Sequence, residues 1–118
     1  MNFIHVTLYV SDLERSLSFY RDVLGLNVLR RMSPGNLDIA FLGEPGQAAI
    51  ELIGDGEVPP HSGFSIGFRV ESLDEAARRL ESAGYPLLRG PLSPDPSVRF
   101  SFFRDPDGTE IQLAEFTR

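Results

Sequence analysis

The sequence repeats itself with an offset of about sixty residues, and this repeat constrains the fold more than any other feature. Apolar positions, glycines and a short apolar–polar–apolar run all share the offset. The matched pairs are Val10 with Val70, Leu13 with Leu73, Tyr20 with Leu80, Gly25 with Gly84, and Ile50-Glu51-Leu52 with Ile111-Gln112-Leu113. Such agreement indicates a duplicated module, and a coincidence between two ordinary αβ segments is the alternative.

The first half predicts a strand, a helix and three further strands. Residues 3–10 are mostly β-branched or aromatic and predict a strand with two distinct faces. Ser11 with Glu14 forms a capping-box pattern, and apolar residues at helical spacing then continue to Gly25, which is a typical helix end. The three strands that follow are expected around residues 26–32, 37–42 and 48–53.

The second half predicts the same order of elements. A strand is expected over residues 64–70, and Ser72 with Glu75 forms a second capping-box pattern. The helix should run over residues 73–83 and end at Gly84. The remaining strands are expected at residues 87–89, 99–103 and 110–116.

These patterns predict an α+β fold built from two βαβββ modules. We expect a single domain over residues 1–118, with module one at residues 1–54 and module two at residues 64–118. A hydrophobic fraction of 42% and nine phenylalanines exclude a disordered chain, which would be polar and poor in aromatic residues.

Charge and composition restrict the partners and the compartment. A net charge of -6 disfavours nucleic acid and anionic membranes, because both attract clustered lysine and arginine. The chain has no cysteine, which excludes disulfides and fits a reducing compartment. Neither a signal peptide nor a membrane span is expected, so the sequence predicts a cytoplasmic protein.

Polar side chains stand alone on strand faces that should otherwise be apolar. In the first strand His5 alternates with Val6, and Ser65 holds the repeat-related position in the second half. Glu51 and Gln112 form a second repeat-related pair. Imidazole nitrogen with carboxylate and amide oxygen is a donor set for a divalent metal. The alternative is a hydrogen-bonded, half-buried His5 and an exposed Glu51 on an edge strand.

Three runs of sequence carry a family resemblance that covers nearly the whole chain. They are HVTLYVSDLERSLSFYRDVLG at residues 5–25, IEL at residues 50–52 and DPDGTEIQL at residues 105–113. The chain resembles the vicinal oxygen chelate superfamily of glyoxalase I, bleomycin-resistance proteins and extradiol dioxygenases, and its motifs are most similar to those of bacterial glyoxalase I, the lactoylglutathione lyase.

The resemblance implies a geometry for the modules. They would pair edge to edge into curved mixed sheets around a cavity, and a short two-module chain would form a homodimer. His5 and Glu51 of one chain would then face Ser65 and Gln112 of the other.

Three positions depart from the glyoxalase I pattern that the resemblance supplies. Ser65 stands where a second ligand histidine is expected, and a neutral hydroxyl is a poor metal ligand. Gln112 stands where the second glutamate is expected, which leaves Glu51 as the aligned carboxylate and the candidate base. Tyr9 replaces an arginine that helps to hold glutathione, so the substrate differs or is held differently.

Two functions follow from the resemblance as leading hypotheses, and a third is weaker. The first is a glyoxalase-like lyase or isomerase with Ni, Zn, Mn, Fe or Co held by His5, Glu51 and Gln112, acting on a small oxygenated substrate. The second is a metal-free protein of the bleomycin-resistance kind that binds or sequesters a small molecule. Its expected aromatic walls are Phe41, Phe100 and Phe102. An extradiol dioxygenase needs two histidines and one carboxylate around iron.

Further residues are expected to contact a ligand. Tyr9 and Ser65 lie on the predicted site face. Arg69 and Arg99 could pair with an anionic ligand, or could be rim residues. His61 could replace the missing histidine ligand, and the alternative is a solvated linker residue after two prolines.

Overall fold

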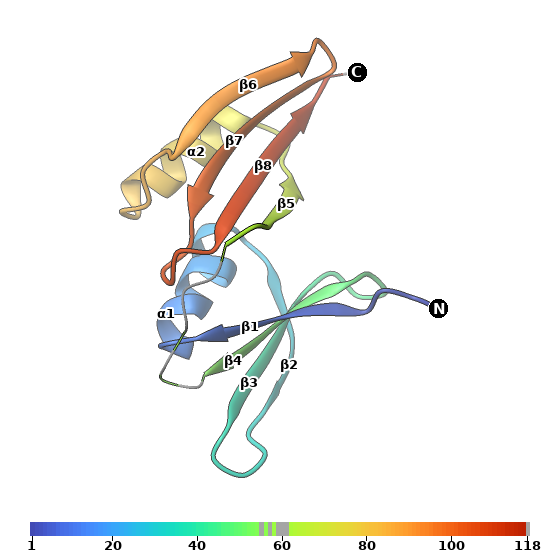
Figure 1. The fold of residues 1–118 in the computed structure, drawn as a ribbon, viewed down its shortest axis with the longest axis vertical. Helices are drawn as coiled ribbons and strands as arrows, with labels where there is room; N and C mark the ends of the chain where they lie inside the picture. The colour runs from blue at the N-terminus through green and yellow to red at the C-terminus, as the bar shows by residue number, and fades with distance from the viewer. Residues whose placement is uncertain (55, 57, 59–61, 118) are drawn as a thin grey trace. The chain divides into compact units, whose positions relative to one another are not determined.

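The computed structural model describes residues 1–54, 56, 58 and 62–117, arranged as two compact units, Met1–Pro60 and His61–Arg118 (Figure 1). Both contain a strand, a helical segment and three further strands, in that order. The predicted βαβββ order is therefore confirmed in each half, while the expectation that both halves form a single domain stays a prediction.

The first unit forms a four-stranded sheet with one helical segment. Its elements are β1 (His5–Val10), α1 (Leu13–Leu17), the π-helix η1 (Ser18–Val23), β2 (Asn27–Met32), β3 (Asp38–Gly43) and β4 (Ala49–Gly54). The strand order is β1-β4-β3-β2, with β1 parallel to β4 and the other pairs antiparallel.

The second unit repeats this topology. Its elements are β5 (Ser65–Arg69), α2 (Leu73–Ser82), β6 (Arg89–Asp95), β7 (Val98–Arg104) and β8 (Glu110–Phe116). The order is β5-β8-β7-β6, with β5 parallel to β8. The register repeats as well, because Thr7 pairs with Glu51 as Gly67 pairs with Gln112.

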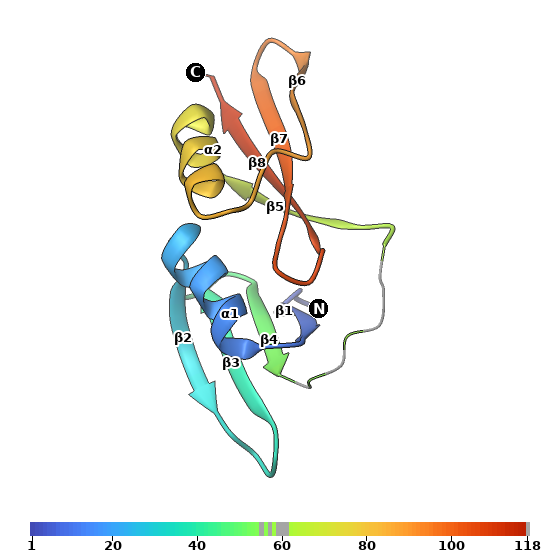
Figure 2. The same cartoon turned by 90° about the vertical axis from the view of Figure 1, so that its left-hand side faces the viewer.

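The helix of each unit covers one face of its sheet (Figure 2). Most side chains that point toward the helix are apolar and form the core, and they recur at every second residue of each strand. In the first unit they include Leu8, Val10, Leu42 and Leu52, and in the second unit Phe103, Ile111 and Leu113. Burying one such side chain contributes about 1.5–3 kcal/mol relative to leaving it in water. The opposite face of each sheet, which we call the open face, carries both aromatic and polar side chains, among them Phe41 and Glu51 in the first unit and Phe102 and Gln112 in the second.

The helix starts differ from the predicted pattern in one half. In the first unit the N-cap is Asp12, whose Oδ1 accepts a hydrogen bond from Arg15 N at 3.1 Å. Ser11 accepts instead from the Arg15 side chain at 3.0 Å, so the capping box predicted for Ser11 and Glu14 is wrong. Asp12 is adjacent to the first helical residue, and only a side chain at that position reaches the free amides of the first turn.

In the second unit Ser72 caps α2, as predicted. Its Oγ accepts a hydrogen bond from Glu75 N at 3.2 Å. Gly25 and Gly84 follow the helical segments with φ angles of 83° and 94°, which confirms both predicted helix ends. The first helix is not α-helical throughout, because η1 widens the turn and buries Phe19 and Tyr20.

The strand β6 is longer than predicted and irregular. It pairs with β7 at Arg89, Leu92 and Asp95, with register shifts between these positions. Pro91 and Pro94 lack a backbone N–H, so they are tolerated at the edge of a sheet but obscure the strand pattern in the sequence. The predicted strand at residues 87–89 therefore overlaps β6 only at Arg89.

Candidate functional site

His5 and Glu51 lie together on the open face of the first sheet. They come from the parallel neighbours β1 and β4, and His5 Nε2 lies 3.4 Å from Glu51 Oε1. Both are partly shielded, with 32% of the His5 side chain and 14% of the Glu51 side chain exposed. The structure thus brings together two of the predicted metal-ligating residues.

Phe41 forms a wall of this pair. Its ring meets the His5 ring edge-on, with centroids 5.7 Å apart and an interplanar angle of 77°. Phe41 also pairs with Glu51 in the β3–β4 register, so the three side chains occupy neighbouring positions on three adjacent strands. The predicted aromatic residue of the first unit therefore does contact the proposed site.

Thr7 is a site residue to which the sequence analysis assigned no role. Its Oγ1 donates a hydrogen bond to Glu51 Oε1 at 2.6 Å. The contact follows from the register, which places Thr7 beside Glu51 across β1 and β4. Since Thr7 shares the parity of His5 along β1, its position on the site face was readable from the sequence, but its partner depended on the strand pairing.

The separation of His5 and Glu51 suits two ligands of one metal. Two ligands at about 2.1 Å from a tetrahedral metal lie about 3.4 Å apart. His5 Nε2 and Glu51 Oε1 are 3.4 Å apart. The part of the chain that the structure describes contains no group of three or more His, Cys, Asp or Glu side chains that could hold a metal ion. The pair therefore fits two coordination positions of one ion.

Gln112 occupies the repeat-related position on the open face of the second sheet. Its Oε1 would lie 3.2 Å from a Cβ placed on Gly67, its neighbour in the β5–β8 register. Gly67 thus leaves the space that Thr7 fills in the first unit. Ser65 is exposed and pairs in register with Glu110. Glu110 lies two residues before Gln112 in β8, so both side chains are on the same face of the sheet.

The two predicted aromatic residues of the second unit lie side by side near Gln112. Phe100 and Phe102 meet edge-on with centroids 5.6 Å apart, and Phe102 pairs in register with Gln112. The Arg89 guanidinium lies over the Phe102 ring, 3.9 Å from its centroid, and forms an ion pair with Glu110. Neither Arg89 nor Glu110 was singled out in the sequence.

The remaining predicted ligand-contacting residues have different outcomes. Tyr9 is on the open face of β1 and is 52% exposed. Arg69 stacks over Phe116, with its Cζ 4.6 Å from the ring centroid, at one end of the second sheet. His61 lies outside the described residues.

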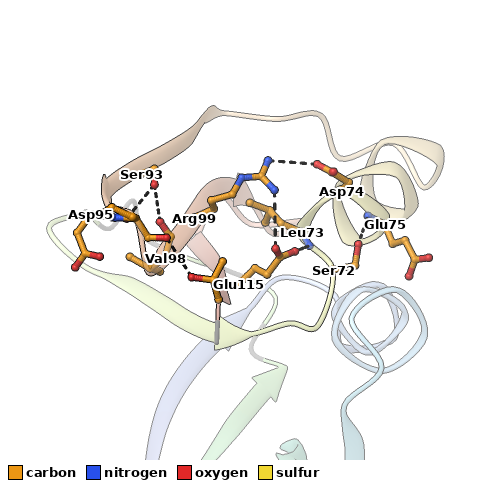
Figure 3. A network of polar contacts seen from close by, with 11 residues as sticks. Ser72, Leu73, Asp74, Glu75, Ser93, Asp95, Val98, Arg99 and Glu115 are labelled. Atoms are coloured by element: carbon orange, nitrogen blue, oxygen red, sulfur yellow. Dashed lines mark hydrogen bonds and ion pairs between the residues drawn. The ribbon is translucent and has the colours of Figure 1, made fainter.

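Arg99 pairs with acidic side chains on the α2-facing side of the second sheet (Figure 3), so of the two roles considered for it, the structure does not place it to pair with a ligand on the open face. Its guanidinium lies 3.5 Å from Asp74 Oδ1 at the start of α2 and 3.9 Å from Glu115 Oε2. Glu115 also accepts a hydrogen bond from Leu73 N at 2.7 Å. Alternation along β7 gives the reason, because Phe100 occupies the open face and its neighbour Arg99 must then face the helix.

Comparison with known proteins identifies the family. The Glyoxalase/Bleomycin resistance protein/Dioxygenase superfamily matches residues 2–113. A probable lactoylglutathione lyase of Synechocystis is 33% identical over 98% of this chain and 95% of its own length. The lactoylglutathione lyase of Salmonella typhimurium is 34% identical over 98% of this chain and 93% of its own length.

Solved structures agree on the fold. Leishmania major glyoxalase I, described as trypanothione-dependent, superposes with a TM-score of 0.85 at 26% identity, covering 98% of this chain and 86% of its own. TnmS3, an antibiotic-binding protein from a Streptomyces species, gives a TM-score of 0.79 at 26% identity, covering 99% of this chain and 97% of its own. Among the described residues, no helix has both the length and the apolar character needed to cross a membrane. The chain belongs to the Glyoxalase/Bleomycin resistance protein/Dioxygenase superfamily.

Proposed function

We propose that this protein is a glyoxalase-like lyase or isomerase that acts on a small oxygenated substrate with the help of a divalent metal. The observation that carries the proposal is the His5–Glu51 pair, whose 3.4 Å separation suits two ligands of one ion. The similarity to lactoylglutathione lyases over nearly the full chain supports the reaction class.

His5 Nε2 and Glu51 Oε1 would hold the metal, and the third ligand that we propose is the amide oxygen of Gln112 from a second copy of the chain. A bound divalent ion would act as a Lewis acid on neighbouring oxygens of the substrate. Ni, Zn, Mn, Fe and Co all accept this donor set. Ser65 contributes no strong donor, and its exposed hydroxyl is better suited to a hydrogen bond with the ligand.

Glu51 is the proposed general base. Thr7 and His5 both contact Oε1 of Glu51. Within the described residues, Oε2 is therefore the carboxylate oxygen that we propose accepts the proton. A glyoxalase moves a proton between two adjacent carbons of a hemithioacetal, and a carboxylate held in place can carry it. Phe41 and Thr7 shield and orient this carboxylate.

The first experiment measures metal content and metal affinity of the purified wild type, His5→Ala and Glu51→Gln, with Ni, Zn, Mn, Fe and Co. Glu81→Gln, an exposed carboxylate on α2, is the matched control. We expect stoichiometric metal in the wild type and the control, and at least about a hundredfold weaker binding in the two site variants. Turnover of the hemithioacetal of methylglyoxal and glutathione is then followed with the loaded protein.

Absence of metal in the wild type, under conditions that load a known glyoxalase, would overturn the proposal. Metal binding without turnover of the hemithioacetal would keep the metal site and reject glutathione as the carrier. The second outcome is a real alternative, since Tyr9 stands at the position of the glutathione-binding arginine that the family resemblance implies.

A metal-free binding protein is the second candidate function. The edge-to-face pair of Phe100 and Phe102 on the open face of the second sheet favours it, because aromatic walls bind apolar small molecules without a ligand set. The similarity in fold to the antibiotic-binding protein TnmS3 supports it. In that case wild type would bind aromatic small molecules equally well in the presence and absence of a chelator.

We also propose that the protein forms a homodimer, which would cover strand edges that are otherwise open to aggregation. Light scattering after gel filtration should give twice the mass of the 13.1 kDa chain. A monomer at micromolar concentration would contradict this.

A further inference from the structure

A small pocket at one end of the second sheet concentrates positive charge. It has a volume of about 150 Å³, and its lining includes Arg104 at the end of β7 and Glu110 at the start of β8. Its charged walls are Arg89, Arg104 and Glu110, and its apolar walls are Phe64 and Leu88. All of these residues belong to the second unit, so the pocket does not depend on the placement of the first.

The charges in this pocket do not cancel. Arg89 forms an ion pair with Glu110, and this leaves the exposed Arg104 as an additional positive charge beside them. Arg104 and Glu110 are register partners at the end of the β7–β8 ladder, so both side chains project from the same end of the sheet. A local excess of positive charge is unexpected in a chain with a net charge of -6.

The fold itself does not require these charges, as the duplicated module demonstrates. Phe103 pairs with Ile111 in the second unit as Leu42 pairs with Ile50 in the first. The following pair of residues is Arg104 with Glu110 in the second unit. At the equivalent position of the first unit, Gly43 lies beside Ala49. The first unit therefore forms this part of the same topology with uncharged residues. A role in binding explains the difference better than a role in stability, because exposed ion pairs contribute little to folding.

The position of Arg89 is held by its surroundings. Its guanidinium stacks on Phe102 and pairs with Glu110, which restricts its rotamers. The neighbouring Gly90 has a φ angle of 110°, and a Cβ there would lie 2.9 Å from Phe100 O. Only glycine lets β6 approach β7 this closely, and this approach places Arg89 beside the pocket.

From these observations we infer that the pocket is a subsite for a small carboxylate with an apolar body. The Arg104 guanidinium would donate two parallel hydrogen bonds to the carboxylate, since its planar fork matches the spacing of the two oxygens. Arg89 adds positive charge, and Phe64 and Leu88 contact the apolar part of the ligand. The subsite requires no metal and stands whether or not the proposed reaction occurs.

The test uses metal-free, full-length protein labelled with ¹⁵N and titrated with sodium benzoate at constant ionic strength, with chloride as the balancing anion. We expect saturable shifts of the backbone amides of Phe64, Leu88 and Arg104. Benzamide, which has the same shape without the charge, should give no saturable shifts. Inorganic phosphate, titrated in the same way, tests whether the subsite prefers a carboxylate.

Two substitutions should move the affinity for benzoate in opposite directions. Arg104→Gln should weaken it about tenfold or more, because a charge-assisted pair of hydrogen bonds is lost. Glu110→Gln should strengthen it about threefold or more, because the carboxylate that competes for Arg89 is removed. Arg78→Gln, an exposed arginine on α2, is the matched control and should leave the affinity unchanged.

Equal affinity of wild type and Arg104→Gln would overturn the inference, as would shifts that cluster away from the pocket or no saturable binding of benzoate. Tighter binding of phosphate than of benzoate would overturn the assignment to carboxylates. Opposite effects of Arg104→Gln and Glu110→Gln would support the subsite and exclude general unfolding as the cause, since unfolding would weaken binding in both variants.

Discussion

Thr7 Oγ1 donates a hydrogen bond to Glu51 Oε1 at 2.6 Å, across the parallel pair of β1 and β4. The same oxygen of Glu51 lies 3.4 Å from His5 Nε2, so the hydroxyl and the imidazole hold one carboxylate oxygen between them. In the second unit Gly67 takes the place of Thr7, and Gln112 takes the place of Glu51. The two repeat-related positions have therefore become chemically unequal.

Replacing Thr7 should weaken both the fold and the proposed metal site. In metal-free protein, Thr7→Val should lower the free energy of unfolding by about 1 kcal/mol, because Glu51 loses a hydrogen bond. Metal affinity should fall about tenfold, as is typical when the partner of a ligand is removed. Urea unfolding and calorimetric titration measure the two effects.

Thr7→Ser is the conservative control, since it keeps the hydroxyl, and it should restore most of the metal affinity. Thr117→Val removes a hydroxyl that donates to Pro96 O at 3.1 Å in the second unit, and it should leave metal affinity unchanged. If Thr7→Val bound metal as tightly as wild type, Thr7 would have no role in orienting Glu51.

Gly90 should tolerate substitution worse than other glycines of similar backbone conformation. A Cβ at Gly90 would lie 2.9 Å from both Phe100 O and Ser101 Oγ, in addition to the cost of a positive φ angle. Gly84 has a φ angle of 94°, and nothing lies within 4 Å of its Cβ position. We expect Gly84→Ala to cost about 1–2 kcal/mol and Gly90→Ala clearly more. Equal urea midpoints for the two variants would contradict this reading of the β6–β7 contact.

The first helix should depend on Asp12 and not on Ser11. Asp12→Ala removes the N-cap acceptor for Arg15 N and should cost about 1 kcal/mol. Ser11→Ala leaves the Asp12 cap in place while removing the exposed contact with the Arg15 side chain, and it should cost less, about 0.5 kcal/mol. Thermal unfolding of the two variants beside wild type decides between them, and a larger loss for Ser11→Ala would restore the capping box predicted from the sequence.

The turn between β6 and β7 gives a prediction about pH. The Ser97 hydroxyl and backbone N–H both donate to Asp95 Oδ1, at 2.6 Å each, and they hold the pKa of the Asp95 carboxyl below its ordinary value. A carboxylate whose pKa is lower in the folded state stabilises the fold above its unfolded pKa, and this contribution is lost as the pH falls through the folded pKa.

Ser97→Ala should therefore raise the pKa of Asp95 toward its ordinary value, as measured by ¹³C NMR of the carboxyl carbon. The pKa of Asp22 provides an internal control, because hydrogen bonding to Arg21 lowers it in the first unit. It should not change in the variant. An unchanged pKa of Asp95 would mean that the Ser97 hydroxyl is not a cause of its shift.

Much of the fold was predictable from local pattern. Alternation placed Leu8 and Val10 on the helix-facing side of β1 and His5 on the other, and glycines after the helical segments marked their ends. The repeat predicted that both halves share one strand order, which the structure confirms. These features succeed because side-chain periodicity follows directly from backbone geometry, with no need for distant contacts.

Prediction failed where two local solutions competed or where proline obscured a strand. Ser11 and Asp12 are both good capping residues, and the structure shows that Asp12 takes this role because the helix begins at Leu13. Arg99 was considered for the open face although its neighbours Phe100 and Phe102 already occupied that face.

By itself the sequence determined the family, the order of the elements and the alternation that places polar side chains such as His5, Thr7 and Glu51 on the strand face away from the helix. Only the tertiary structure decided which of those side chains meet. Thr7 contacts Glu51, which lies 44 positions away in the sequence. Arg89 of β6 lines one pocket together with Arg104 of β7 and Glu110 of β8. The physical reason is that lateral neighbours in a sheet depend on the register of hydrogen bonds between strands that are far apart in the chain, and no local periodicity encodes that register.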